Sequence, residues 1–198
     1  MTEMNPVSRF FVNQSATWRS RRTYGWVRTD VVVPESVTCL EIGSGSGEFA
    51  ARFVRGFRPF RYVATDVDPH QLEVAKATIR KRLQSELPPS LVLREADMLH
   101  LPFDPRSFDL IFAFVAIHHA SPDHHDFGSV PQALSEIDRV LRPGGQIVYQ
   151  EFLHKAAIRD WLHRHQYEIL RLHARWRLES VVARKPSLSP AVSASPVS

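Results

Sequence analysis

Three glycines at alternate positions stand between an apolar run and a segment with helical spacing. The run at 37–42 is suited to a buried strand, and Gly43, Gly45 and Gly47 follow it. Glycine tolerates positive φ and has no Cβ to hold a ligand away from the backbone. A helix directly behind the turn adds a partial positive charge at its N-terminus. The pattern predicts a strand, a ligand-binding turn and a helix, with an ordinary tight β–α connection as the alternative.

Two glutamates narrow the kind of ligand. Glu41 lies two residues before Gly43, at the mouth of the turn. A dinucleotide-binding fingerprint, Gly-x-Gly-x-x-Gly, would need glycine at position 48, where this chain has Glu48. The spacing therefore disfavours a dinucleotide cofactor.

A carboxylate ends the next predicted strand, at 61–66. Asp66 at that place can accept hydrogen bonds from both hydroxyls of a ribose, and Val67 beside it is assigned to the same site. Asp68 stands directly before Pro69, which suits the N-cap of the following helix instead.

A second carboxylate follows the predicted strand at 90–94. Asp97 is succeeded by the bulky apolar residues Met98 and Leu99. In such a segment the acid can accept the exocyclic amine of an adenine while the apolar side chains pack on the ring. We therefore expect Asp97 and Met98 to bind a base.

Four histidines lie within eight residues, in the pair His118-His119 and in the segment 123–126. Such a cluster raises the possibility of a metal site. Adjacent histidines in a strand would point to opposite faces, and no cysteine supports the cluster. We therefore expect no metal site.

The composition is that of an ordinary soluble domain. The 198 residues are 43% hydrophobic and 23% charged, which suffices for one domain with its own core. No apolar run approaches the roughly 20 residues of a membrane span, and the N-terminus lacks a signal-peptide pattern, so a cytoplasmic location is expected. Cys39 is the single cysteine, which excludes intrachain disulfides and Cys-based zinc sites.

The net charge of +4 raises the question of an anionic partner such as nucleic acid. The arginines are scattered, and the densest group is Arg19, Arg21 and Arg22, close to Trp18. We expect a solvated basic face, with a nucleic-acid surface as the weaker alternative.

The elements that must position these residues are expected in three parts. Residues 1–36 form an N-terminal lid or brace with a helix around 7–18, 37–185 form the main domain, and 186–198 form a disordered tail. The expected strands span 37–42, 61–66, 90–94, 108–114, 146–152, 167–172 and 176–183. One helix is expected directly after the glycine turn, and further helices are expected at 69–87, 130–141 and 155–165. A tight turn at 142–145 separates the helix at 130–141 from the fifth strand.

From about residue 37 to residue 185 the chain resembles class I S-adenosylmethionine-dependent methyltransferases, and among them the small-molecule enzymes of the ubiquinone-biosynthesis type. Five landmarks carry the resemblance in order. They are 41–47 (Glu-Ile-Gly-Ser-Gly-Ser-Gly), Asp66, Asp97 with 101–103, 107–111 leading to His118-His119, and 136–145 ending in Arg-Pro-Gly-Gly. The resemblance implies a Rossmann-like seven-stranded α/β fold, mostly parallel, with an antiparallel last strand.

The resemblance also assigns roles. Glu41 and the three glycines would hold the methionine portion of S-adenosylmethionine, Asp66 the ribose, and Asp97 with Met98 the adenine. Phe114 and Val115, at the end of the fourth strand, would line the methyl-transfer site.

Two departures from the family pattern concern the acceptor and a turn. The last two strands lack the long insertion that often covers the substrate, so the site is either open or completed by a second chain in a homodimer. Gln166 stands where the family usually has glycine, which affects a turn and not the chemistry.

Methyl transfer from a sulfonium is an in-line displacement that depends mostly on proximity and alignment. A nucleophile that must lose a proton would also use a general base. By position His119 or His118 is the candidate, then Glu151, and the alternative is that these residues only shape the pocket.

We expect a small-molecule methyltransferase. A cofactor-binding domain without catalysis is the first alternative, and a nucleic-acid methyltransferase is the second. The segment 114–118 lacks the Pro-Pro signature of base-flipping enzymes, so no nucleic-acid partner is expected.

Overall fold

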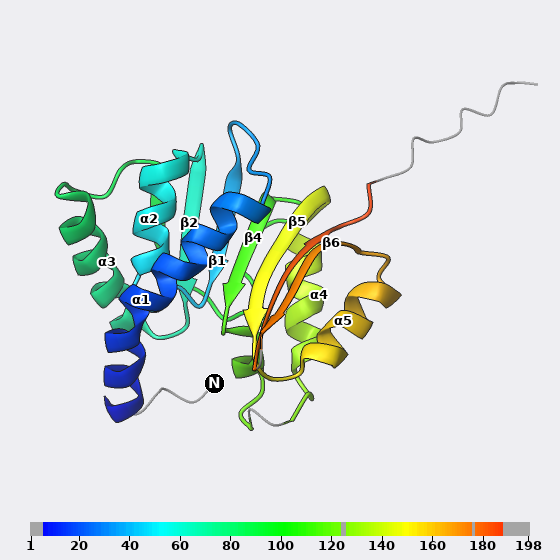
Figure 1. Ribbon diagram of the computed structural model, residues 1–198. Coiled ribbons are helices and arrows are strands. Elements are labelled where there is room, and N and C mark those ends of the chain that lie inside the picture. Colours follow the sequence, from blue (N-terminus) through cyan, green and yellow to red (C-terminus); the bar gives the residue numbers. More distant parts are fainter. Residues whose placement is uncertain (1–5, 124–125, 176, 188–198) are drawn as a thin grey trace, which may run out of the picture.

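A single seven-stranded sheet forms the centre of the molecule (Figure 1). The computed structural model describes residues 6–123, 126–175 and 177–187, with side chains from residue 17. The spatial strand order is β3-β2-β1-β4-β5-β7-β6. The strands are β1 (Thr38–Ile42), β2 (Arg61–Asp66), β3 (Leu91–Glu95), β4 (Phe108–Phe114), β5 (Leu141–Glu151), β6 (Glu168–Arg175) and β7 (Leu178–Arg184).

The sheet is parallel from β3 to β5, and β7 is antiparallel to both of its neighbours. The strand order reverses beside β1, between β2 and β4. In such sheets ligands bind beyond the carboxyl ends of the strands at that reversal. The expected Rossmann-like fold with an antiparallel last strand is confirmed.

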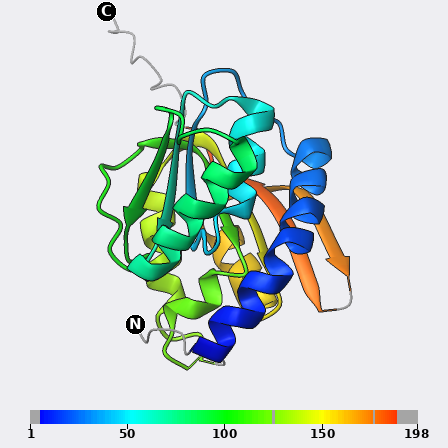
Figure 2. The same ribbon diagram turned by 90° about the vertical axis from the view of Figure 1, so that its left-hand side faces the viewer.

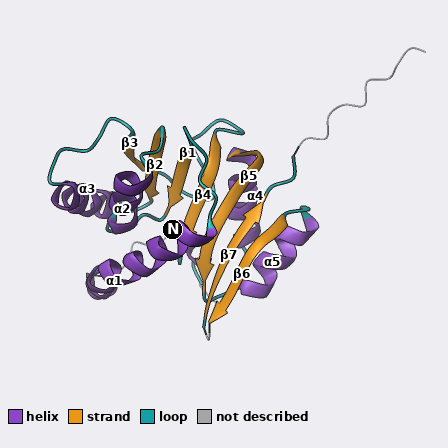
Figure 3. Ribbon diagram, turned by 45° about the horizontal axis from the view of Figure 1, so that its top comes forward, coloured by secondary structure: helices purple, strands orange, loops and turns teal. Residues whose placement is uncertain are grey.

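Helices cover both faces of the sheet (Figure 3). One face carries α1 (Pro6–Asp30), α2 (Glu48–Phe57) and α3 (Pro69–Leu83), and the other carries α4 (Val130–Val140) and α5 (Lys155–Arg164). Each face has its own apolar core: Phe53 and Ile79 pack in the first, and Leu134 and Ile158 in the second. Among the described helices, none is long and apolar enough to cross a membrane.

The N-terminal helix is longer than the sequence predicted. α1 has 25 residues and continues to Asp30 instead of ending near residue 18 (Figure 2). Its buried stripe of described side chains is Ser20, Thr23 and Val27, which lie three and four residues apart. Two of these three residues are polar, so a search for apolar periodicity misses the stripe.

Boundaries of other elements also differ from the expectations, among them the end of β6, which lies at Arg175 and not at residue 172. α3 ends at Leu83 and not near residue 87, because Gln84 adopts a left-handed conformation with φ 56°. The third strand starts and ends one residue later than expected. The tight turn expected at 142–145 is a bulge within β5, since Leu141 already pairs with Phe108 before Gln146 pairs with Leu110.

At the C-terminal end, the expected strand pairing is confirmed, and other expectations concern residues that the structure does not describe. β6 and β7 form the expected antiparallel pair with a short connection. Trp176 in that connection, His124 and His125, and the tail from residue 188 are not among the described residues.

Candidate functional site

A cavity of about 1370 Å³ lies at the carboxyl edge of the parallel strands. Its walls come from the ends of β1, β2, β4 and β5, from the middle and C-terminal half of α1, and from the β6–β7 hairpin. Ligand pockets usually have about 300–1,000 Å³. This cavity therefore has room for two molecules side by side.

Two of the three glycines of the turn line the cavity. Gly43, Gly45 and Gly47 all have positive φ, at 67°, 51° and 72°. A Cβ on Gly43 would stand 2.8 Å from the Cβ of Ala116, whereas one on Gly45 would meet nothing within 4 Å. The backbone at Gly45 is thus open to a ligand.

Gly47 has a different position from the other two glycines and is absent from the cavity wall. A Cβ there would stand 2.9 Å from the Cβ of Ala75 and 3.1 Å from its carbonyl oxygen. Gly47 therefore permits the close approach of α2 and α3 behind the turn.

Glu41 is a buried acid in the cavity wall, only 3% exposed. Its Oε2 accepts a hydrogen bond of 2.8 Å from the hydroxyl of Tyr62. Burial raises the pKa of Glu41 to about 8, and the neighbouring Asp66 adds to the rise while the Tyr62 hydrogen bond opposes it. At neutral pH the carboxyl is therefore mostly protonated, and a cation placed beside it would favour its ionisation.

Asp66 ties the second strand to the glycine turn. Its Oδ2 accepts the N–H of Gly45 at 2.9 Å, and its Oδ1 accepts the N–H of Asp68 at 3.1 Å. Burial raises the pKa of Asp66 in spite of these hydrogen bonds. Asp66 and Val67 both line the cavity. Asp68 accepts the N–H of His70 at 3.0 Å, which confirms the predicted helix cap.

The segment after β3 contributes Ala96 and Met98 to the cavity wall, and Met98 is buried. Asp97 stands between them but is not part of the wall. Its Oδ1 accepts the N–H of Leu99 at 2.8 Å, which closes the turn after β3. The sequence did not indicate Ala96, because a small apolar residue carries no functional signal.

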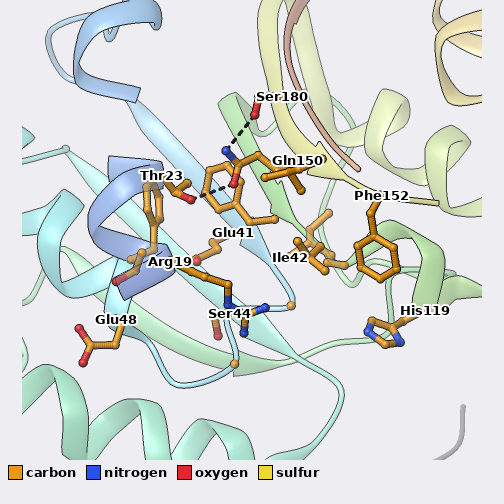
Figure 4. Close-up of a pocket in the computed structure, with 18 of the residues that line it drawn as sticks. Arg19, Thr23, Glu41, Ile42, Ser44, Glu48, His119, Gln150, Phe152 and Ser180 are labelled. Carbon is orange, nitrogen blue, oxygen red and sulfur yellow. Dashed lines mark hydrogen bonds between the residues drawn. The ribbon is translucent and has the colours of Figure 1, made fainter. Parts of the chain in front are cut away.

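The two adjacent histidines lie on the short 3-10 helix Ile117–Ala120, with their ring centroids 4.0 Å apart, but only one of them is in the cavity wall. His119 lines the cavity, and Figure 4 shows its ring near Phe152. His118 lies outside the wall: its Nδ1 is 2.8 Å from Oε2 of Glu151, and both side chains are buried. The other oxygen of Glu151 accepts the N–H of Ile117 at 2.7 Å.

Glu151 and His118 thus fix the 3-10 helix, and His119 is the histidine presented to the cavity. Phe114, at the end of β4, also lines it. Within the described ranges, no group of three histidine, cysteine or acidic residues is placed to hold a metal ion. His124 and His125 lie outside those ranges.

The helix α1 supplies wall residues that the sequence did not assign to the site. The hydroxyl of Thr23 donates to Oε1 of Gln150 at 2.8 Å, and Nε2 of Gln150 donates to the hydroxyl of Ser180 at 3.0 Å. Figure 4 shows Arg19 extending from α1 toward the glycine turn at Ser44. The hydroxyl of Ser44 is buried and has no hydrogen-bond partner among the described residues.

A partly buried ionic contact fixes the outer part of α1. Glu48, at the start of α2, accepts hydrogen bonds from Nη2 of Arg82 at 2.7 Å and from the hydroxyl of Thr17 at 2.9 Å. The residue that excluded a dinucleotide fingerprint therefore links α1, α2 and α3.

Comparison with known proteins gives a family for this fold and site. The family described as Methyltransferase domain matches residues 40–149. The chain is 30% identical over 122 residues to phthiotriol/phenolphthiotriol dimycocerosates methyltransferase of Mycobacterium leprae, covering 62% of this chain and 40% of the relative. It is 32% identical over 147 residues to 2-phytyl-1,4-naphtoquinone methyltransferase of Nostoc sp., covering 73% and 55%. The chain thus spans about half the length of these curated relatives or less.

A solved structure matches over almost the whole chain. The SAM-dependent methyltransferase from Aquifex aeolicus superposes with a TM-score of 0.70 at 16% identity, covering 92% of this chain and 99% of that one. At this identity the likeness establishes the fold alone. The sheet order, the glycine turn and the match to more than half of the chain together show that this protein belongs to the methyltransferase domain family with the class I fold.

Proposed function

We propose that this protein transfers a methyl group from S-adenosylmethionine to a small-molecule acceptor. The observation that carries the proposal is the cavity at the strand-order reversal, large enough for two ligands and acidic at its glycine-turn end. Glu41, Asp66 and Asp68 stand at that end. Acidic groups there suit a cofactor that carries a sulfonium and an ammonium.

The residues of the glycine turn fit the methionine portion of this cofactor. The buried hydroxyl of Ser44 lacks a partner among the described residues, and the space beside Gly45 is open. We expect Glu41 to accept the ammonium, and Ser44 with Arg19 to bind the carboxylate. Arg19 suits that role because a guanidinium binds carboxylates with paired N–H groups.

The next two strand ends fit the nucleoside portion. Asp66 uses one lone pair of each oxygen on backbone N–H groups, which leaves the others for ribose hydroxyls. Val67, Ala96 and Met98 give an apolar slot for the adenine. The oxygen of Asp97 that does not close the turn is assigned to the exocyclic amine.

When bound, S-adenosylmethionine would supply an electrophilic methyl group on a sulfonium that becomes a neutral thioether. The chain's part is to align the acceptor with that methyl and to exclude water. Phe114 and Phe152 form apolar wall on the acceptor side. His119 can accept the proton that an acceptor hydroxyl loses as its oxygen bonds to the methyl carbon. Glu151 and His118 would act as positioning residues for it.

The names of the relatives support a small-molecule acceptor. Both named relatives are methyltransferases for small molecules, one a naphtoquinone and the other a phthiotriol. Since the chain spans only part of each relative, their acceptors are not carried over to it individually.

Two measurements test the proposal. Calorimetric titration with S-adenosylhomocysteine should show binding of one molecule per chain, and labelled S-adenosylmethionine should transfer its methyl to a compound in a metabolite extract. Binding without any transfer would favour a non-catalytic domain. Transfer to RNA, with binding that falls steeply as salt is added, would favour a nucleic-acid methyltransferase.

Two histidine substitutions, one in the cavity wall and one outside it, test the proposed general base. His119→Ala should slow transfer to a hydroxyl acceptor by about 10²–10⁴-fold. His163→Ala, an exposed change on α5, is the matched control. Unchanged turnover of His119→Ala would show that His119 is not the general base. It would not contradict the proposal that the protein transfers a methyl group.

A further inference from the structure

We propose that the methyl acceptor has an apolar body with an anionic head, a carboxylate or a phosphate, and that Arg22 of α1 and Arg175 of the β6–β7 hairpin bind this head. The inference rests on the proposed function, because it concerns the part of the cavity that the cofactor would leave open. It names a class of acceptor that the relatives' names do not imply.

The charged residues of the cavity wall differ between the strand ends and the elements that face them. The acids Glu41, Asp66 and Asp68 come from the ends of β1 and β2, or directly after them. The helix α1 and the β6–β7 hairpin supply the arginines of the wall, which are Arg19, Arg22, Arg175 and Arg177, together with the acid Asp30. A cationic cofactor at the acidic strand ends thus leaves positively charged wall for the second ligand.

The strand register brings the hairpin to the same edge as the glycine turn. β7 runs antiparallel to β5, and Glu179 pairs with Glu151 at the carboxyl end of β5. Arg175 pairs with Leu178 at the tip of the hairpin. The tip therefore lies just beyond the edge at which the parallel strands end.

The two arginines are available to an external anion. Both are exposed, and neither forms an ion pair with a described residue. The guanidinium of Arg22 lies 4.8 Å from the ring centroid of Trp18, which orients it without neutralising its charge. Asp30 also lines the cavity, and its Oδ2 is 3.5 Å from Nε2 of His173.

The cavity wall also offers apolar surface for the body of the acceptor. Trp18, Phe152 and Leu178 are 62%, 42% and 37% exposed, and all three line the cavity. The indole N–H of Trp26, also in the wall, is buried without a partner among the described residues, so it can donate to the bound molecule. Exposed apolar side chains beside unpaired arginines suit an amphipathic anion.

The test compares three probes that share one apolar body: naphthalene-1-carboxylate, 1-naphthyl phosphate and naphthalene-1-carboxamide. Equilibrium dialysis measures each against the protein saturated with S-adenosylhomocysteine and against the protein alone. The double variant R22Q/R175Q removes the charges of Arg22 and Arg175. The matched control R28Q/R171Q removes two exposed arginines from the same helix and strand, outside the cavity wall.

We expect at least one anionic probe to bind wild type about tenfold more tightly than the amide, as for a charge-assisted hydrogen bond of ~1.5 kcal/mol. The preference should fall below about threefold in R22Q/R175Q, persist in the control, and weaken with added salt. Whether the carboxylate or the phosphate binds more tightly identifies the head group.

Equal binding of the amide and the anions would overturn the inference, as would no binding of any probe or an equal loss in the control variant. A short single-stranded RNA is tested in the same way. If it binds wild type more tightly than the probes do, and if this binding is lost in R22Q/R175Q, the arginines bind nucleic acid instead. The salt response of wild type keeps the test valid if the double variant does not fold. Absence of S-adenosylhomocysteine binding would refute the proposed function separately, since the anion preference is also measured without it.

Discussion

Glu41 should release a proton when a cationic cofactor binds. Its carboxyl is buried against the hydroxyl of Tyr62, and its pKa is raised from the ordinary 4.5 to about 8. At pH 7 about nine-tenths of the molecules therefore carry the proton before binding. An ammonium in contact with the carboxylate would lower that pKa again, so binding at pH 7 should release up to about 0.9 proton.

The same shift sets the pH dependence of affinity. Between pH 6 and pH 7.5 the ionised fraction of a group with pKa 8 rises about twentyfold, and the association constant for S-adenosylmethionine should rise by a similar factor. Glu41→Gln keeps an acceptor for Tyr62 but cannot ionise. The variant should bind about 10- to 100-fold more weakly at pH 7.5, because it loses a charge-assisted hydrogen bond of ~1.5–3 kcal/mol, and its affinity should be nearly independent of pH in this window.

Calorimetry in two buffers of different ionisation enthalpy measures the proton release directly. Thermal melts of the protein without ligand provide the control. Because the pKa of Glu41 is higher in the folded than in the unfolded state, its protonated form stabilises the fold at low pH, and this stabilisation is lost as pH rises toward 8. Glu41→Gln should therefore gain stability relative to wild type between pH 5 and pH 9. No proton release, together with a pH-independent affinity of wild type, would refute this reasoning.

Four further substitutions have expected outcomes in stability. Gly47→Ala should lower the free energy of unfolding by about 1–3 kcal/mol, because its Cβ meets α3 and its φ is positive. Gly25→Ala, with open space in the C-terminal part of α1, should raise the free energy of unfolding by about 0.4–1 kcal/mol. Equal effects of the two substitutions in urea titrations would contradict the packing argument. Arg82→Gln should cost about 1–3 kcal/mol, since it leaves a buried carboxylate of α2 poorly satisfied, and proteolysis should then cut α1 faster than in wild type. Glu151→Gln should cost about 1–3 kcal/mol because it weakens the buried hydrogen bonds to His118 and Ile117. A melting temperature equal to that of wild type would show that these hydrogen bonds are not structural.

The turn, and the strand and helix beside it, could be predicted from the sequence because their signals are local. β1 is a short apolar run buried on both faces, and Gly43 and Gly45 have the backbone geometry that only glycine adopts readily. The order of the strands and helices after the turn was enough to predict the rest of the fold. The cap at Asp68 followed from the proline beside it.

The sequence could not distinguish neighbouring residues of the same type, and it did not show contacts between distant parts of the chain. His118 and His119 are equivalent in the sequence, and only the 3-10 helix turns one toward Glu151 and the other toward the cavity. Gly43 and Gly47 look alike, yet only Gly43 is in the cavity wall. The bulge in β5 was missed because Pro-Gly-Gly favours a turn wherever it occurs, while the pairing of Leu141 depends on β4.

The polar attachment of α1 to the sheet has a consequence for the order of folding. Thr23 contacts Gln150 across 127 positions of the chain, and Gln146 donates to the carbonyl of Val32 across 114. During synthesis α1 is therefore made first, but its partners on β5 are made more than a hundred residues later. An isolated helix with a mostly polar stripe gains little from forming early. Pulse-labelled hydrogen exchange during refolding should find the amides of α1 protected after those of β1 and β4, so that the cavity closes only in the last step.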